Sequence, residues 1–199
     1  RDFVHSGAKL SAETRAELMK LNERQSELET LFGTNILNDQ NDLAVHVTAI
    51  EELDGLSDGE IAAAAAAAAN RGLEGWLIDM VNYTGNPALA SLTHRELREK
   101  IMHNTVIKGA RDNANDNRPV LVELAKLRAK RANLLGHPTH AAYVLEEQTA
   151  GNPANVHAML RTIAPAAIRN AKAEAADIQA MIDAETAANG SNSFAVQSW

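Results

Sequence analysis

The sequence contains no cysteine and few basic residues. Without a thiol, the chain cannot carry a disulfide framework, a thiolate nucleophile or a thiolate metal site. Lys and Arg number 19 against 26 Asp and Glu, which gives a formal net charge of −7 at pH 7. Nucleic acids and anionic membrane surfaces bind proteins through a wide positive field, so we expect neither as a partner.

Long apolar segments are missing as well. The longest uncharged apolar run covers residues 61–69, less than half of the roughly 20 residues that span a bilayer. We read no signal peptide at the start, and we therefore expect a soluble, cytoplasmic protein. The sequence begins at Arg1 rather than Met and ends at Trp199, directly after a polar segment. From this we expect a fragment of a longer protein.

Alanine is the most abundant residue in the sequence. The chain has 37 alanines among its 199 residues, whereas aromatic residues make up only 4%. Alanine has the highest intrinsic helix propensity, so the composition alone favours helices. A chain of this length has room for one sizeable core, and we predict a single helical domain over residues 1–199.

Apolar residues recur at the three- and four-residue spacing of an amphipathic helix over much of the chain. With the start and stop signals at their ends, these patterns predict helices over residues 11–40, 57–70, 93–107, 117–135 and 152–189, and a shorter helix that begins at Thr139. Residues 43–48 alternate in polarity and residues 76–81 are largely apolar, which predicts two strands that pair with each other. The predicted fold class is mainly α, a multi-helix bundle with a small two-stranded β insertion.

Polar residues at the predicted helix starts indicate N-caps. Ser57 with Glu60, and Thr93 with Glu96, each have the separation of a capping box. Asn152 is followed by proline, which is typical of a first helical turn. Other predicted boundaries have similar cap residues: Asn117 before a helix, and Gly72 and Gly136 after one.

The seven histidines are the first candidates for metal binding or general-base chemistry. His137 and His140 are three residues apart, but a proline and the predicted cap at Thr139 place His137 outside the following helix. We interpret both as loop or cap residues, because a pair lacks the remaining ligands of a zinc site. Glu99 and His103 are one helical turn apart, and we interpret them as an exposed surface pair.

Two further features have a functional and a structural interpretation. A basic stretch suggests RNA binding, but it is interleaved with apolar residues in an acidic chain, so we favour the solvated side of a helix; it comprises Lys126, Arg128, Lys130 and Arg131. Residues 83–87 lie beside the second predicted strand and could line a peptide groove by edge pairing. An ordinary turn is the interpretation we favour for them.

Motifs of known metal, phosphate and nucleophile chemistry are absent. The sequence has neither a Glu-x-x-His pair nor a His-Glu-x-x-His zinc motif. It also lacks the glycine-rich phosphate loops and the Gly-x-Ser-x-Gly nucleophile elbow. We therefore assign no catalytic, cofactor-binding or metal-binding residue to this chain.

Several short blocks follow one another along the chain: Leu73-Glu74-Gly75-Trp76, Pro87-Ala88-Leu89-Ala90-Ser91-Leu92-Thr93, Leu97-Arg98-Glu99, Asp116-Asn117-Arg118-Pro119, Ala132-Asn133-Leu134-Leu135-Gly136 and His140-Ala141-Ala142-Tyr143-Val144-Leu145-Glu146. In this order they resemble the amino-terminal half of the thimet-oligopeptidase-type zinc metallopeptidases, and the peptidyl-dipeptidase branch in particular. The resemblance extends over nearly the whole chain. One departure is Gln148-Thr149-Ala150-Gly151, where the family usually has a Met-Ala pair and a basic residue.

The resemblance implies a function for the parent protein rather than a site on this chain. Members of the family are almost entirely helical and form two lobes around a deep channel with zinc at its floor. Their His-Glu-x-x-His motif and third ligand lie downstream, and no position here matches them. The chain is thus expected to be a non-catalytic scaffold and channel wall, without zinc or peptidase activity of its own, whose partner is the missing C-terminal catalytic half.

The parent enzyme implied by this resemblance uses zinc to release dipeptides from the C-terminus of short peptide substrates. An alternative from a different class is a stand-alone helical protein-interaction module without catalytic activity. A His-Glu-x-x-His motif further along the coding sequence would distinguish the two.

Overall fold

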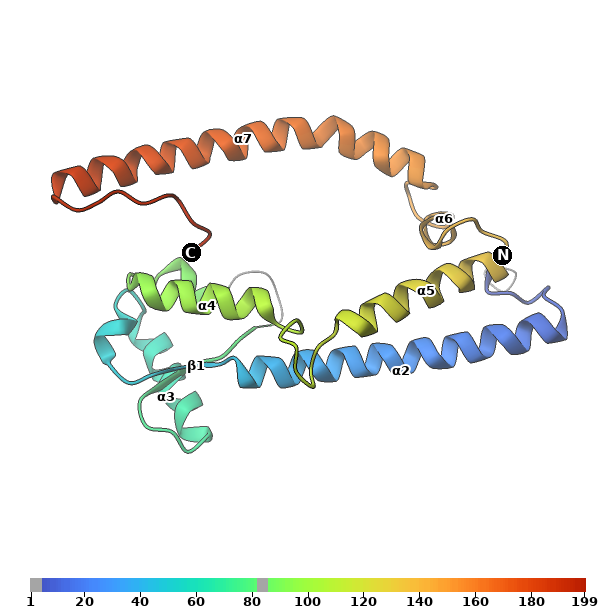
Figure 1. The fold of residues 1–199 in the computed structure, drawn as a ribbon, viewed down its shortest axis with the longest axis horizontal. Helices are drawn as coiled ribbons and strands as arrows, with labels where there is room; N and C mark the ends of the chain where they lie inside the picture. Colours follow the sequence, from blue (N-terminus) through green and yellow to red (C-terminus); the bar gives the residue numbers. More distant parts are fainter. Residues whose placement is uncertain (1–4, 82–85) are drawn as a thin grey trace. The chain divides into compact units, whose positions relative to one another are not determined.

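The computed structural model describes residues 5–81 and 86–199, and helices make up most of them (Figure 1). The elements in chain order are α2 (Ala12–Asp42), β1 (Val45–Val47), the 3-10 helix η1 (Ile50–Leu53), α3 (Asp58–Asn70), β2 (Trp76–Ile78), the 3-10 helix η2 (Pro87–Ala90), α4 (Arg95–Ile107), α5 (Arg118–Leu134), α6 (His140–Leu145) and α7 (Pro153–Ala188). The predicted mainly α fold class is confirmed. No helix in the described part of the chain is long and apolar enough to cross a membrane.

The predicted two-stranded insertion is also confirmed. β1 and β2 pair in antiparallel orientation, with Val45 opposite Ile78 and Val47 opposite Trp76. Val45 and Val47 are buried and His46 between them is exposed, which is the alternation expected of a strand with one buried face. Each strand has three residues and is shorter than its predicted range, 43–48 or 76–81.

The chain divides into two compact units, with boundaries inside α2 and α5. The first unit combines residues up to 18 with residues 128–198, and the second comprises residues 19–127 together with Trp199. The prediction of one helical domain over residues 1–199 stays a prediction.

The core of the second unit lies around the small sheet. Buried side chains from β1, η1, β2, α4 and the segment just before α4 form one cluster; it includes Val45, Val47, Leu53, Ile78, Leu92, Leu97 and Ile101. Leu28 of α2 packs with Val120 and Leu124 of α5 in a second, smaller cluster. Gly75 lets the segment before β2 approach β1, because its φ is +86° and a Cβ there would lie 2.5 Å from the carbonyl oxygen of Val47.

Most predicted helix boundaries are confirmed. Ser57 and Glu60 form both hydrogen bonds of a capping box at the start of α3. The Thr139 side chain accepts a hydrogen bond from the backbone of Ala142 at the start of α6, and Asn152 does the same for Asn155 at the start of α7. Gly72 and Gly136 both have positive φ after their helices.

The predicted capping box at Thr93 and Glu96 is wrong. The Thr93 hydroxyl instead donates to the Asp54 carboxylate at 2.8 Å, so a tertiary partner takes the group that would have capped α4. The N-cap is His94, whose Nδ1 accepts a hydrogen bond from the backbone N–H of Leu97 at 3.3 Å. Sequence spacing could not reveal this shift because Asp54 lies on a different segment.

In the first unit, α7 is the longest helix, with 36 residues. Thr186 is its one buried residue in the described structure, although the sequence of the helix is apolar at many positions. The Thr186 hydroxyl is hydrogen-bonded within the helix, since it donates to the carbonyl oxygen of Ile182 at 2.7 Å. The apolar side chains of this helix are therefore largely in contact with solvent.

Candidate functional site

The structure places His140 inside α6 and His137 outside it. His140 is the first residue of α6, and His137 lies in the turn before that helix, as the sequence predicted. Burial, together with the positive charges of Arg128 and Arg131, lowers the pKa of His140 below its usual value. Both rings lie near Tyr143, with centroids 5.3 and 6.4 Å from that of the tyrosine ring. Because His137 lies outside α6, the two histidines do not form a ligand pair on one helical face.

His137 instead belongs to a cluster that joins three segments of the first unit. His5 precedes α2, His137 follows α5, and Glu146 is the residue directly after α6. Nε2 of His5 and Nε2 of His137 each lie 3.5 Å from the same carboxylate oxygen, Oε2 of Glu146. Among residues 5–81 and 86–199, these three form the one group of three or more His, Asp or Glu side chains arranged closely enough to share a metal ion.

Aromatic packing positions the two imidazole rings. The ring of His5 stacks on Tyr143 of α6 with centroids 4.3 Å apart and an interplanar angle of 7°. The ring of His137 meets the same tyrosine edge-on at 5.3 Å. Arg131 lies over the Tyr143 ring, 4.8 Å from its centroid. The side chains of His5 and His137 are 12% and 20% exposed, so both rings are largely shielded while Glu146 remains open to solvent at 45%.

Sequence reasoning missed this cluster. His5 and Tyr143 are 138 positions apart, and no local spacing connects residues at that separation. The only signal available was weaker: His5 precedes the first predicted helix and His137 follows the predicted helix over residues 117–135. The interpretation of His137 as an ordinary loop residue did not consider a partner near the start of the chain.

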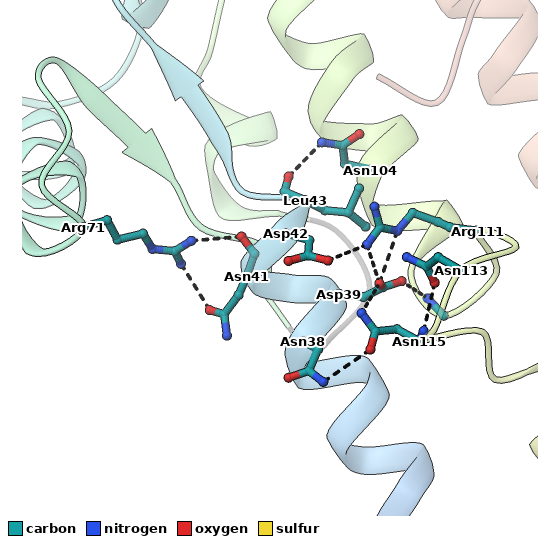
Figure 2. A network of polar contacts seen from close by, with 11 residues as sticks. Asn38, Asp39, Asn41, Asp42, Leu43, Arg71, Asn104, Arg111, Asn113 and Asn115 are labelled. Atoms are coloured by element: carbon teal, nitrogen blue, oxygen red, sulfur yellow. Dashed lines mark hydrogen bonds and ion pairs between the residues drawn. The ribbon is translucent and has the colours of Figure 1, made fainter.

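The most extensive buried polar site lies in the second unit, around Asp39 near the end of α2 (Figure 2). The Asp39 side chain is 0% exposed. Its Oδ2 accepts a hydrogen bond from the backbone N–H of Gly109 at 2.6 Å, and its Oδ1 accepts one from Arg111 Nη2 at 2.5 Å. Asn115 Nδ2 donates to Oδ1 at 3.3 Å. A charged carboxylate is thus fully enclosed by donors.

These contacts set the protonation state of Asp39. Burial alone would raise its pKa, but the hydrogen bonds from Arg111, Gly109 and Asn115 outweigh it and hold the pKa below the usual value. Arg111 also contacts Asp42 at 3.0 Å, and its own pKa is raised chiefly by the hydrogen bond to Asp39. The carboxylate is ionised at neutral pH and its lone pairs are occupied, so it is suited to holding a loop and not to proton transfer.

The Asp39 network fixes the loop between α4 and α5 on the end of α2. A neighbouring amide pair extends it, since Asn35 Nδ2 donates to Oδ1 of Asn117 at 2.9 Å and both residues are buried. Asn104 of α4 donates a hydrogen bond to the carbonyl oxygen of Leu43, the residue directly after α2, at 2.7 Å (Figure 2). The network therefore connects α2, α4 and the start of α5.

The remaining sequence candidates have ordinary structural surroundings. Glu99 and His103 are both exposed on α4. In the basic stretch, Lys130 pairs with Glu17 at 2.6 Å. Of residues 83–87, residues 83–85 lie outside the described part of the chain, and Asn86 caps η2 by accepting a hydrogen bond from the backbone of Ala88.

Asn86 also lines a small open hollow of about 240 Å³ beside β2 and α3. Its other lining residues are mostly apolar, among them Ala64, Ala67, Leu77, Pro87 and Ala88. Among the described residues that line the hollow there is no histidine, and the acidic ones are Glu60 and Asp79. Glu60 is held in the α3 capping box and Asp79 pairs with Arg71 at 2.7 Å, so neither is arranged as a free acid or base.

Comparison with known proteins connects this fold to a group of peptidases. Residues 88–199 match the family model described as "Peptidase family M3". The chain is 37% identical to the dipeptidyl carboxypeptidase of Escherichia coli over 198 residues, which is 99% of this chain and 28% of that protein. It is 34% identical to the Salmonella typhimurium dipeptidyl carboxypeptidase over 198 residues, with the same shares of each chain.

A second kind of relative is also similar. The oligopeptidase A of Escherichia coli is 30% identical over 189 residues, which cover 93% of this chain and 28% of that protein. The chain thus spans little more than a quarter of the length of the curated relatives it matches.

Proposed function

Because the chain belongs to peptidase family M3, we propose that it is the non-catalytic helical part of a zinc-dependent peptidyl-dipeptidase, in which it forms scaffold and channel wall. Two of the similar proteins are named dipeptidyl carboxypeptidases, which supports the release of C-terminal dipeptides from short peptides as the parent activity. The proposed partner is the C-terminal catalytic part of the same protein. The expected cytoplasmic location stays a prediction.

The observation that carries this proposal is the similarity of 99% of the chain to dipeptidyl carboxypeptidases, and the uncovered apolar face of α7 supports the scaffold role. Large apolar side chains recur near both ends of this helix and are half exposed or more: Met159 53%, Leu160 49%, Ile163 54%, Ile178 48% and Met181 71%. At 100° per residue these five positions fall on one side of the helix, and Ala167 and Ala171 continue that side through its middle. A soluble protein rarely leaves such a face in water, so the face fits a helix that packs on another part of a larger protein.

Covering this face would contribute a substantial free energy. Full burial of a large apolar side chain contributes about 1.5–3 kcal/mol. These five side chains are already about half covered, so covering the rest would contribute on the order of 1 kcal/mol each, or roughly 5 kcal/mol for the face. That amount is comparable with the whole stability of a small domain.

The residues present do not fit the catalytic zinc of the family. That site needs two histidines one turn apart on a helix with a glutamate between them, and the sequence has no such motif. The described cluster of His5, His137 and Glu146 takes its side chains from three separate segments and has no helical glutamate placed as a general base. We therefore propose no catalytic residue on this chain, and no step of peptide hydrolysis is assigned to it.

Fragment complementation tests the proposal. The chain would be expressed together with the downstream polypeptide of its reading frame, and cleavage of an amino-blocked peptide would be followed with and without chelator. We expect neither piece alone to cleave and the mixture to regain chelator-sensitive activity. The paired substitution Ile163→Ser and Met181→Ser should weaken complementation, whereas Arg161→Ser, on the opposite side of α7, should not. Full activity of the downstream piece alone would contradict the scaffold role.

The stand-alone interaction module is the second candidate, and the same apolar face of α7 is what favours it. The two candidates differ in whether the reading frame contains a zinc-binding motif. A reading frame that closes without a His-Glu-x-x-His motif supports the module, and a frame that contains the motif supports the peptidase.

A further inference from the structure

In place of the expectation from the sequence that this chain binds no zinc, we propose that His5, His137 and Glu146 form a binding site for one divalent transition-metal ion. The site would connect the segment before α2 to the turn between α5 and α6 within the first unit. It concerns only residues of this chain and does not depend on the peptidase function proposed above.

The distances fit metal coordination. Zinc bound tetrahedrally to nitrogen and oxygen at about 2.0–2.1 Å places its ligand atoms about 3.3–3.4 Å apart. The Nε2 atoms of His5 and His137 each lie 3.5 Å from Oε2 of Glu146. The three ligand atoms all lie within 4.8 Å of one another, so a movement of up to about 1.4 Å would bring the two nitrogens to the separation that zinc requires.

The ligand chemistry narrows the class of ion. Two imidazoles and one carboxylate suit zinc, cobalt, nickel, iron or copper, whereas calcium and magnesium prefer sites made of oxygen alone. Three protein ligands leave a fourth position for water, and the 45% exposure of Glu146 leaves the site open to solvent on that side.

The surroundings of His5 supply the support that metal-binding imidazoles require. A ligating histidine usually directs its second ring nitrogen to a carboxylate. Nδ1 of His5 lies 3.7 Å from Oε2 of Glu147, which is longer than a hydrogen bond, so an approach of about 0.7 Å would let Glu147 take this role. Stacking on Tyr143 holds the plane of the His5 ring.

One existing contact would have to change. Nε2 of His5 lies 3.2 Å from the carbonyl oxygen of Tyr143, a geometry in which the ring donates its proton there. Metal binding at Nε2 moves that proton to Nδ1, on the side of Glu147. The carboxylates of Glu146 and Glu147 also offset the nearby positive charge of Arg131, which lies over Tyr143.

The resulting site would act as a structural clip. His5 belongs to a segment near the start of the chain, and the other two ligands belong to the α5–α6 region. A metal ion that binds only the folded arrangement stabilises it by mass action. The ion would therefore hold His5 beside the residues that flank α6, and it would increase the thermal stability of the first unit.

The test uses the 199-residue chain, with Zn²⁺ for calorimetry and Co²⁺ for visible spectroscopy. We expect one Zn²⁺ per chain, a dissociation constant in the micromolar range or below, an increase in melting temperature with Zn²⁺, and the intense visible absorption of four-coordinate Co²⁺. His5→Gln, His137→Gln and Glu146→Gln should each weaken Zn²⁺ binding at least about tenfold. Glu147→Gln should weaken it less.

His157→Gln is the matched control, because His157 is exposed on α7 and lies outside the cluster. This variant should bind Zn²⁺ like the parent chain. Circular dichroism of each variant without metal separates loss of a ligand from loss of folding. Absence of stoichiometric binding to the parent chain overturns the proposal, and so does binding that folded variants of His5 and His137 leave unchanged.

Discussion

Substitution of the buried Asp39 tests most sharply which contacts stabilise the folded chain. We predict that Asp39→Ala lowers the free energy of unfolding by about 3 kcal/mol at pH 7. The substitution removes the acceptor for the backbone N–H of Gly109, for the guanidinium of Arg111 and for the amide of Asn115. The loop between α4 and α5 would lose its main attachment to α2.

The magnitude follows from which partners remain satisfied. A buried N–H left without an acceptor costs about 1–3 kcal/mol, and Gly109 is in that position. Arg111 is 23% exposed and keeps Asp42 as a partner, so its loss is smaller than the 3–5 kcal/mol typical of a fully buried ion pair. Asp42→Asn is the matched control: Asp42 binds the same arginine but is 56% exposed, and its loss should cost about 0–1 kcal/mol.

The effect also has a defined dependence on pH. Because the hydrogen bonds lower the pKa of Asp39, its ionised form contributes stability that is fully present above the ordinary value near 3.9. That contribution is lost as pH falls through the lower pKa of the folded state. The difference in stability between the parent chain and Asp39→Ala should therefore be largest at neutral pH and shrink below about pH 4.

Urea denaturation followed by circular dichroism measures all three free energies of unfolding, at pH 7 and at pH 3. The reasoning is refuted if Asp39→Ala and Asp42→Asn have equal effects at pH 7. It is equally refuted if the effect of Asp39→Ala grows as the pH is lowered.

Two further substitutions test local structure by the same denaturation assay. Ser57→Ala should cost about 1 kcal/mol because it removes the capping box of α3, and a cost near zero would show that Glu60 alone caps the helix. Gly75→Ala should destabilise by more than about 1 kcal/mol, because the position has φ +86° and a Cβ would lie 2.5 Å from the Val47 carbonyl oxygen. Gly59→Ala is its control, since Gly59 lies in α3 and, apart from its chain neighbours and the backbone of its own helix, no atom lies within 4 Å of the added carbon; this change should be neutral or stabilising.

Local patterns predicted the elements of the fold well because their causes are local. The capping pair Ser57 and Glu60, and the Asn152 start of α7, involve residues within one turn of each other. Alternation along β1 identified the strand for the same reason. Where a distant residue competes, the prediction failed: Asp54 takes the Thr93 hydroxyl, and His94 becomes the cap of α4.

The polar sites lay beyond the reach of local patterns. Asp39 and its donors at Gly109, Arg111 and Asn115 are about 70 positions apart in sequence, and His5 is still further from Tyr143. Spacing rules describe one helix or one hairpin, whereas these contacts arise when separate elements pack. The order of the sequence blocks did predict the family, and the family match over residues 88–199 confirms that prediction.

One measurement tests the central claim most directly. The complete reading frame that contains residues 1–199 would be expressed, depleted of metal with a chelator and reloaded with Zn²⁺, and a short amino-blocked peptide would be followed by mass spectrometry. The account predicts stepwise loss of dipeptides from the C-terminus, which stops with chelator and returns with Zn²⁺. Cleavage at internal bonds alone would contradict the peptidyl-dipeptidase assignment, and absence of any metal-dependent cleavage would contradict the peptidase function itself.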